Sequence, residues 1–238
     1  MCDARANAGD ASGLIVFDVD GTIADTVALH HGALLEAMRS FAIPRLDTDW
    51  GSYPNHTDAA IFEDAWFAGF GRTPTLAERG AFERRMNAAF DAASEPAPIR
   101  EIAGAVRFIE TARRAGWALA FATGGLRKLT LKKLAAIGLE FPEDVVVTSS
   151  EHPARNALVA GAVAAARAHY RTFPKKIVSF GDGRWDFETA QALGLAFVGV
   201  GAGPKADELR KRGAVVLQDF QDLPTAFAAL SETGAPPP

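Results

Sequence analysis

The chain has 238 residues, of which 48% are hydrophobic and 23% are charged, and this balance is typical of a globular protein rather than a disordered or fibrous one. The formal net charge of −4 gives no reason to expect nucleic acid as a partner. The single cysteine, Cys2, can form neither an intrachain disulfide nor a thiolate metal site. No apolar stretch reaches the length of a membrane span. We therefore expect a cytoplasmic protein that binds neither nucleic acid nor a membrane.

Short apolar runs alternate along the chain with segments of helical periodicity. Strands are predicted over 14–17, 118–122, 145–148, 177–180, 196–200 and 214–217. Helices are predicted over 102–115, 126–137, 155–170, 185–193 and 205–212. The strands are continuously apolar rather than alternating, which indicates a parallel sheet covered on both faces. The repeated strand–helix–strand order therefore predicts an α/β fold with a doubly wound, Rossmann-like parallel sheet.

The interval between the first strand and the helix at 102 breaks this alternation, because it holds no good strand candidate. Amphipathic helices are predicted there over 26–41, 57–67 and 76–91, and a stiff linker over 94–98. This pattern predicts a helical cap over 27–97, inserted into a core formed by 13–26 and 98–232. The ends of the chain, 1–12 and 233–238, are expected to be flexible.

Acidic residues follow two of the predicted strands directly. Asp18 and Asp20 come after the first strand, and residues two apart in an extended chain point to the same side. Asp182 and Asp186 lie in the sequence GDGRWD that follows the fourth strand. Open α/β sheets bind ligands at the carboxyl ends of their strands, and carboxylate oxygens suit Mg²⁺. If the two strands are neighbours, Asp18 and Asp182 share one ion. The alternative is that these residues only cap helices.

Two further features fit a phosphate site. Thr123 and Gly124 end the second strand and precede a helix, where a hydroxyl and backbone N–H groups can bind an anion. Arg155, at the start of a helix after the third strand, can supply the cation. The alternatives are an ordinary glycine turn at Thr123 and a solvated surface side chain at Arg155.

The motifs together resemble those of the haloacid dehalogenase-like hydrolase superfamily. DVDGT at 18–22 matches its first motif, FATGG at 121–125 its second, and GDGRWD at 181–186 is similar to its fourth. The insertion after the first motif resembles the C1 cap of that superfamily. The phosphoglycolate phosphatase-like members are the most similar subgroup, and the likeness extends over 14–217.

The resemblance implies a role for each of these residues. Asp18 would be the nucleophile that forms an aspartyl-phosphate, and Asp20 would protonate the leaving oxygen and then activate water. Asp18, Asp20 and Asp182 would contribute to the Mg²⁺ site with Asp186 supporting them, and Thr123 would hold the phosphate. For this chemistry we expect Asp18 to have a low pKa and Asp20 to carry a proton at first.

One motif departs from the pattern of the superfamily. Its third motif is usually a lysine, and no lysine stands at that place in this chain. Arg155 takes the position best, although a guanidinium binds phosphate with a geometry different from that of an ammonium group. Lys175 and Lys176 precede the fourth strand, which places them at the opposite end of the sheet.

The resemblance implies a Mg²⁺-dependent phosphatase that hydrolyses a small phosphorylated metabolite through an aspartyl-phosphate. The alternatives are a phosphomutase of a sugar phosphate, a receiver-like signalling domain and a ligand-binding member without activity. Asp20 argues against dehalogenation, which needs no proton donor, and the lack of lysine in 27–97 argues against Schiff-base phosphonate chemistry. A homodimer is an open alternative to a monomer.

Polar and aromatic residues of the insertion are candidates for specificity or packing. The polar group is His30, His31, Asn55, His56, Thr57 and Asp58. For the segment around Thr57 we favour a helix N-cap, and for the histidines an interface or surface position. Trp66, Phe67 and Phe70 are expected to pack in the core, with a dimer contact as the alternative.

Overall fold

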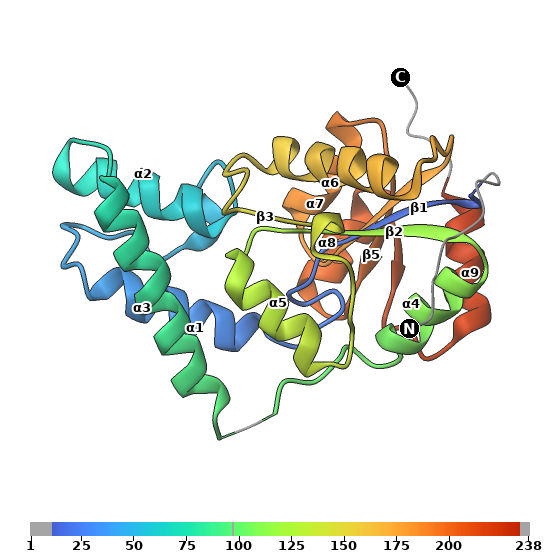
Figure 1. The fold of residues 1–238 in the computed structure, drawn as a ribbon, viewed down its shortest axis with the longest axis horizontal. Coiled ribbons are helices and arrows are strands. Elements are labelled where there is room, and N and C mark those ends of the chain that lie inside the picture. Colours follow the sequence, from blue (N-terminus) through green and yellow to red (C-terminus); the bar gives the residue numbers. More distant parts are fainter. Residues whose placement is uncertain (1–10, 97, 234–238) are drawn as a thin grey trace.

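The computed structural model describes residues 11–96 and 98–233, and a single parallel sheet organises most of them (Figure 1). Its strands are β1 (Gly13–Phe17), β2 (Trp117–Thr123), β3 (Val146–Thr148), β4 (Ile177–Gly181), β5 (Ala196–Val200) and β6 (Val215–Leu217). Their order across the sheet is β3-β2-β1-β4-β5-β6, and every neighbouring pair is parallel. The predicted doubly wound α/β fold is confirmed, since the chain reverses its direction of progress between β1 and β4.

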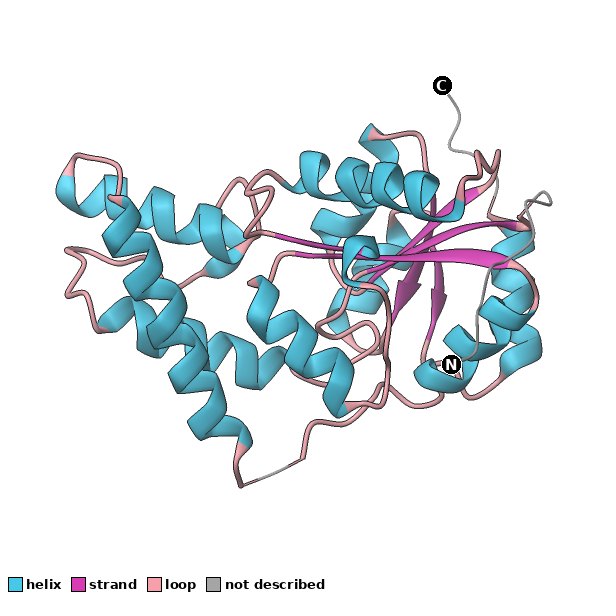
Figure 2. Cartoon of the chain, in the orientation of Figure 1, coloured by secondary structure: helices cyan, strands magenta, loops and turns pink. Residues whose placement is uncertain are grey.

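Helices cover both faces of the sheet (Figure 2). They are α4 (Ala105–Arg114), α5 (Arg127–Ala136), α6 (Arg155–Tyr170), α7 (Arg184–Ala192), α8 (Pro204–Lys211) and α9 (Leu223–Glu232). Alternate residues of β1 serve the two faces: Ile15 and Phe17 pack toward α4, α5 and α9, whereas Leu14 and Val16 pack toward α6, α7 and α8. This double coverage is the reason why the strands are apolar throughout.

Helix α9 is absent from the sequence-based prediction. Its sequence, LPTAFAALSE, carries one charged residue, so it lacks the polar stripe by which an amphipathic helix is recognised. Asp222 caps the helix by accepting a hydrogen bond from the backbone N–H of Thr225. Ala226 and Leu230 then pack against the sheet core.

The segment between β1 and α4 forms a separate helical layer, which Figure 1 shows at the left. It contains α1 (Val27–Arg39), the 3₁₀ turn η1 (Trp50–Ser52), α2 (Asp58–Phe70) and α3 (Leu76–Ser94). These helices enclose a hydrophobic cluster in which the rings of Phe62 and Phe82 stack 4.3 Å apart. Leu126 and Leu129 at the start of α5 join this cluster, so the layer is seated on the second strand–helix turn of the core.

The edges of the predicted segments shift by a few residues. Helix α3 extends to Ser94 and takes up the start of the predicted linker 94–98, of which residue 97 lies outside the described residues. Most of the ends expected to be flexible, 1–12 and 233–238, also lie outside them. Ser12 and Thr233 are described and hydrogen bond to the folded chain, Ser12 to Gly116 and Thr233 to Ala229. The connection from α5 to β3 contains the short 3₁₀ turn η2 (Glu143–Val145).

The aromatic residues of α2 do not all pack in the core. Trp66 is buried within the helical cluster, as expected. Phe67 and Phe70 are 58% and 41% exposed, so the expectation of core packing was wrong for both. Phe70 borders the cluster, since its ring centre lies 4.7 Å from that of Trp66. None of the described helices combines the length and apolarity needed to span a bilayer.

Phe108 of α4 is the residue on which we test the packing of the sheet core. It is fully buried and its ring lies 5.0–6.3 Å from those of Phe17, Phe180 and Phe220. We expect Phe108→Ala to lower the free energy of unfolding by about 3–5 kcal/mol, because it leaves a cavity. Chemical denaturation measures this loss. Phe173→Ala, at a site 80% exposed, is the control and should change stability by less than about 0.5 kcal/mol.

Candidate active site

The two central strands bring their acidic loops together. β1 and β4 are neighbours in register, and the backbone N–H of Asp18 donates to the carbonyl of Phe180 at 2.9 Å. Asp18 and Asp182 therefore begin the loops after adjacent strands at the point where the direction of winding reverses. Gly21 allows the loop after β1 to pack closely against Asp182. Its φ is +80°, and a Cβ there would lie 2.6 Å from Oδ2 of Asp182.

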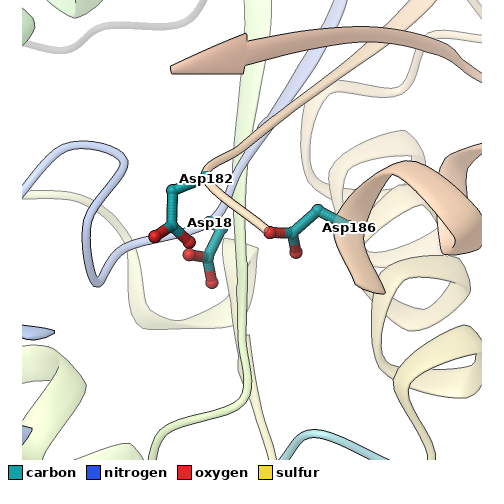
Figure 3. A group of neighbouring side chains, drawn as sticks. All are labelled: Asp18, Asp182 and Asp186. Carbon is teal, nitrogen blue, oxygen red and sulfur yellow. The ribbon is translucent and has the colours of Figure 1, made fainter. Parts of the chain in front are cut away.

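Three carboxylates meet at this edge of the sheet (Figure 3). Asp18, Asp182 and Asp186 each offer one oxygen, and these oxygens lie within 4.8 Å of one another. Asp186 comes from the first turn of α7, where its Oδ2 accepts a hydrogen bond of 3.1 Å from the N–H of Gly183. An all-oxygen group of this kind fits Mg²⁺, which takes carboxylate ligands together with water and substrate phosphate.

The crowding of negative charge changes the acidity of two of these groups. Burial and repulsion from Asp186 raise the pKa of Asp18 well above its ordinary value, although Arg155 acts in the opposite direction. Burial and the same repulsion raise the pKa of Asp182 to about 6, with Lys205 opposing them. The low pKa expected for Asp18 depends on Mg²⁺ as well as on Arg155; without a cation, burial and the neighbouring carboxylates outweigh the one guanidinium.

Arg155 supplies a cation to the site, as expected from its place in the sequence. It is buried at the first position of α6, where Nη2 lies 3.5 Å from Oδ1 of Asp18 and also pairs with Asp186. Its Nη1 donates to the carbonyl of His56 at 2.8 Å, so the same guanidinium contacts the inserted layer. Among the described residues its Nε finds no hydrogen-bond partner, which leaves one donor unused.

The residues expected to bind phosphate face the same cavity. Thr123 ends β2, and its hydroxyl accepts a hydrogen bond of 3.3 Å from the N–H of Gly125. Gly124 is closely packed, because a Cβ there would lie 2.7 Å from the carbonyl oxygen of His56. Both residues line one pocket with a cavity of about 50 Å³. The predicted site residues that share this pocket are Asp18, Asp20, Thr123, Gly124, Arg155 and Asp182.

The side chain of Asp20 lies apart from the cluster of three carboxylates formed by Asp18, Asp182 and Asp186. Both of its oxygens contact Nζ of Lys133, at 2.6 and 2.7 Å, and one accepts a hydrogen bond from the hydroxyl of Thr26. Asp186, expected as a supporting residue, is the third of these carboxylates. Burial favours the protonated form of Asp20, but Lys133, His30 and the hydrogen bonds prevail and lower its pKa far below the ordinary value. In the substrate-free protein these contacts therefore favour the ionised form of Asp20.

Sequence reasoning missed two lysines of this region. Lys133 is on α5, on the inward face that also carries Leu129 and Leu134. Because a lysine at an apolar position of a helix is unusual, that placement was the available signal. Lys205, at the start of α8, lies 3.1 Å from Oδ2 of Asp182. No pattern in the sequence pointed to it.

The histidines and polar residues of the insertion divide into two groups. His30 is buried, and its Nε2 lies 2.8 Å from Oδ1 of Asp58. Thr57 caps α2 as expected and also donates to the carbonyl of Pro153 at 2.6 Å. Asn55 accepts a hydrogen bond from the N–H of Thr57 but does not line the main pocket.

The second group forms an aromatic edge of the pocket. The ring of His56 stacks on Trp185 at 3.6 Å with an interplanar angle of 5°. His31 lies beside it at 6.4 Å between ring centres. Burial, together with the charge of Arg155, lowers the pKa of His56 to about 3, so His56 is a neutral ring in this stack.

The raised pKa of Asp182 leads to a test of the metal site. Between the ordinary value of 3.8 and about 6, the folded protein holds this proton more tightly than the unfolded chain does, so metal-free stability falls as pH rises through that window. Protons compete with a cation in the same window. We expect saturating MgCl₂ to raise the Tm by about 5 °C or more near neutral pH, and by progressively less as pH falls through about 6.

Differential scanning fluorimetry with and without MgCl₂ across this pH range measures the effect. Asp182→Asn should abolish the Mg²⁺-dependent rise in Tm, because it removes a ligand charge. Asp144→Asn, whose side chain is 63% exposed, is the matched control and should retain the rise. A Tm that does not respond to Mg²⁺ at any pH would contradict the proposed metal site.

Comparison with known proteins agrees with this architecture. A hydrolase from Pseudomonas syringae matches with a TM-score of 0.73 at 21% identity, covering 94% of this chain and all of that one. A putative beta-phosphoglucomutase from Bacteroides vulgatus matches with a TM-score of 0.70 at 17% identity, covering 93% and 89%. The tyrosine-protein kinase PtkA of Mycobacterium tuberculosis is 26% identical over 88% of this chain and 69% of its own length. The family model for haloacid dehalogenase-like hydrolases matches residues 13–194, and the chain belongs to that family.

Proposed function

We propose that the chain is a Mg²⁺-dependent phosphatase that hydrolyses a small phosphorylated metabolite through an aspartyl-phosphate on Asp18. One observation carries this proposal. A group of three carboxylates suited to a cation and a buried guanidinium suited to a phosphate converge on one pocket, at Asp18 and Arg155. Transfer of a phosphoryl group depends chiefly on positioning and on stabilising negative charge, and this pocket provides groups for both.

The cluster of three carboxylates fits Mg²⁺, which prefers oxygen ligands. Asp18, Asp182 and Asp186 would hold Mg²⁺, and the repulsion that helps to raise the pKa of Asp18 and Asp182 favours a cation there. The bound ion would reduce the repulsion between the three carboxylates and the phosphate. Thr123 and Arg155 would bind the non-bridging phosphate oxygens, and Gly124 and Gly125 line the same pocket.

The reaction then proceeds in two steps. An oxygen of Asp18 attacks phosphorus, the bond between phosphorus and the ester oxygen breaks, and the leaving oxygen takes a proton from Asp20. In the second step, Asp20 takes a proton from water as that water attacks phosphorus, which breaks the Asp18–phosphorus bond and releases inorganic phosphate. The lowered pKa of Asp20 in the substrate-free site suits its role as the base in the second step, and for the first step Asp20 has to take up a proton when the substrate binds.

The inserted layer, 27–97, would act as the cap. Its residues His31, Trp50, His56 and Ile61 line the pocket together with core residues, so the substrate is enclosed from both sides. The cavity between the two layers is small, at about 50 Å³. Enclosure also excludes bulk water and strengthens the electrostatic interactions within the site.

Other outcomes for the same site are separated by what happens to the phosphoryl group. Release of inorganic phosphate supports hydrolysis, whereas return of the group to another hydroxyl identifies a phosphomutase. A phosphorylated Asp18 that persists without turnover identifies a receiver-like member. Transfer from ATP to tyrosine, the activity in the name of the mycobacterial relative, is assayed beside them.

Asp18→Asn tests the nucleophile. We expect the wild type to release inorganic phosphate from at least one ester in a panel of sugar and organic phosphates with Mg²⁺. The variant should lose activity about a thousandfold or more, because an amide cannot form the aspartyl-phosphate. It should fold at least as stably, since it removes a carboxyl whose ionisation is disfavoured by burial. Asp144→Asn is the surface control, and normal turnover by Asp18→Asn would exclude Asp18 as the nucleophile.

Arg155→Lys and Arg155→Met test the phosphate-binding cation. For Arg155→Met we expect KM to rise about tenfold or more, because the bound anion loses its charge partner. This variant also leaves Asp186 without its partner, at a cost of about 3–5 kcal/mol in stability. Arg155→Lys keeps the positive charge but loses the planar guanidinium that can bind phosphate through two nitrogens. Its KM should therefore lie between those of the wild type and Arg155→Met. Steady-state kinetics that are unchanged in both variants would place the phosphate cation elsewhere.

A further inference from the structure

A buried lysine lies behind the main pocket. The side chain of Lys133 has no exposed surface, and its Nζ contacts both oxygens of Asp20 and, at 2.8 Å, Nδ1 of His30. The ring of Phe90, centred 5.1 Å from Nζ, closes its far side. Burial of an ammonium group is costly, and an apolar residue would suit this face of α5 without that cost.

Lys133 is placed to act on Asp20 rather than on a substrate. Asp20 lines the pocket, with 15% of its side chain exposed, whereas Lys133 is not among the residues lining it. The Asp20 carboxyl is thus held from one side by Lys133 and from another by the hydroxyl of Thr26. Two directional partners fix a carboxyl far more closely than one.

The contact of Lys133 with His30 connects this carboxyl to the inserted helices. His30 is on α1, and its other ring nitrogen lies 2.8 Å from Asp58 at the start of α2. Asp58 in turn accepts a hydrogen bond of 3.0 Å from the N–H of Leu126 and donates its own N–H to the carbonyl of Gly124 at 2.8 Å. Asp58 therefore fastens α2 to the turn that carries the phosphate-binding groups.

We propose that Lys133 is a positioning residue that orients the Asp20 carboxyl for proton transfer and couples that orientation to the seating of α1 and α2 on the core. The proposal rests on the phosphatase function, since it assigns Lys133 a part in the step that protonates the leaving group. If the inserted helices move away, His30 leaves Lys133, and the ammonium group loses one of the contacts that hold it against Asp20. Proton transfer is thereby confined to the closed pocket.

The test compares two substrates that differ in their need for a proton. An alkyl phosphate releases a strongly basic oxygen that must be protonated, whereas p-nitrophenolate leaves without a proton. For Lys133→Met we expect kcat on the alkyl phosphate to fall about tenfold or more beyond any fall on p-nitrophenyl phosphate. Lys128→Met, at an exposed position of the same helix, is the matched control and should leave the ratio unchanged.

A double-mutant cycle separates positioning from a structural role. Asp20→Asn should lower the same ratio, and adding Lys133→Met to it should lower the ratio no further, because the group that Lys133 orients is already gone. Lys133→Met alone leaves the charge of Asp20 without its partner and is expected to destabilise the fold. The double variant removes both charges of the pair, so we expect it to be the more stable of the two. An equal fall on both substrates, or additive effects in the cycle, would overturn the proposal.

A structural measurement makes the result independent of the proposed function. Absence of turnover by the wild type on both esters would count against the phosphatase, not against the orienting contact. A crystal structure of Lys133→Met, or of Lys133→Gln where the first variant fails to fold, is then decisive. We expect the Asp20 carboxyl to leave Thr26 and adopt a new side-chain rotamer, and an unchanged carboxyl would overturn the role of Lys133.

Discussion

The imbalance of charge at the carboxyl ends of β1 and β4 is the constraint on which the rest of the site depends. Asp18, Asp182 and Asp186 lie together with Arg155 as the guanidinium among them, and burial prevents water from screening their repulsion. Such a site favours cations and, through them, anionic ligands. Its location follows from the sheet order, because only adjacent strands at the reversal of winding can bring these loops together.

Asp18 and Asp20 show how far the environment can shift the pKa values of two aspartates in opposite directions. They are two positions apart, yet the pKa of Asp18 is raised and that of Asp20 is lowered. The difference arises because Asp18 faces two other carboxylates, whereas Asp20 faces the ammonium of Lys133. A site that assigns different proton-transfer roles to neighbouring carboxyls requires a difference of this kind. A bound cation beside Asp18 would act on its pKa in the opposite direction to the repulsion.

The elements with strong local signals could be predicted from sequence, and those decided by tertiary contacts could not. The apolar runs that became β1 and β4, with Asp18 and Asp182 directly after them, predicted both the fold and the meeting of these side chains. The orientation of Asp20 was not predictable, because it depends on Lys133, more than a hundred positions away in the chain. The weakly patterned α9 was missed for a related reason: only packing on the sheet identifies its buried face.

The close approach at Gly124 has a consequence for how such a protein can change its choice of ligand. The inserted layer meets the phosphate-binding turn there through a main-chain carbonyl, that of His56, and main chain cannot shorten as a side chain can. The separation between the two layers at this point is therefore fixed by backbone geometry. Divergence toward larger or smaller ligands would have to proceed through side chains of the inserted layer that line the pocket, such as Trp50 and Ile61.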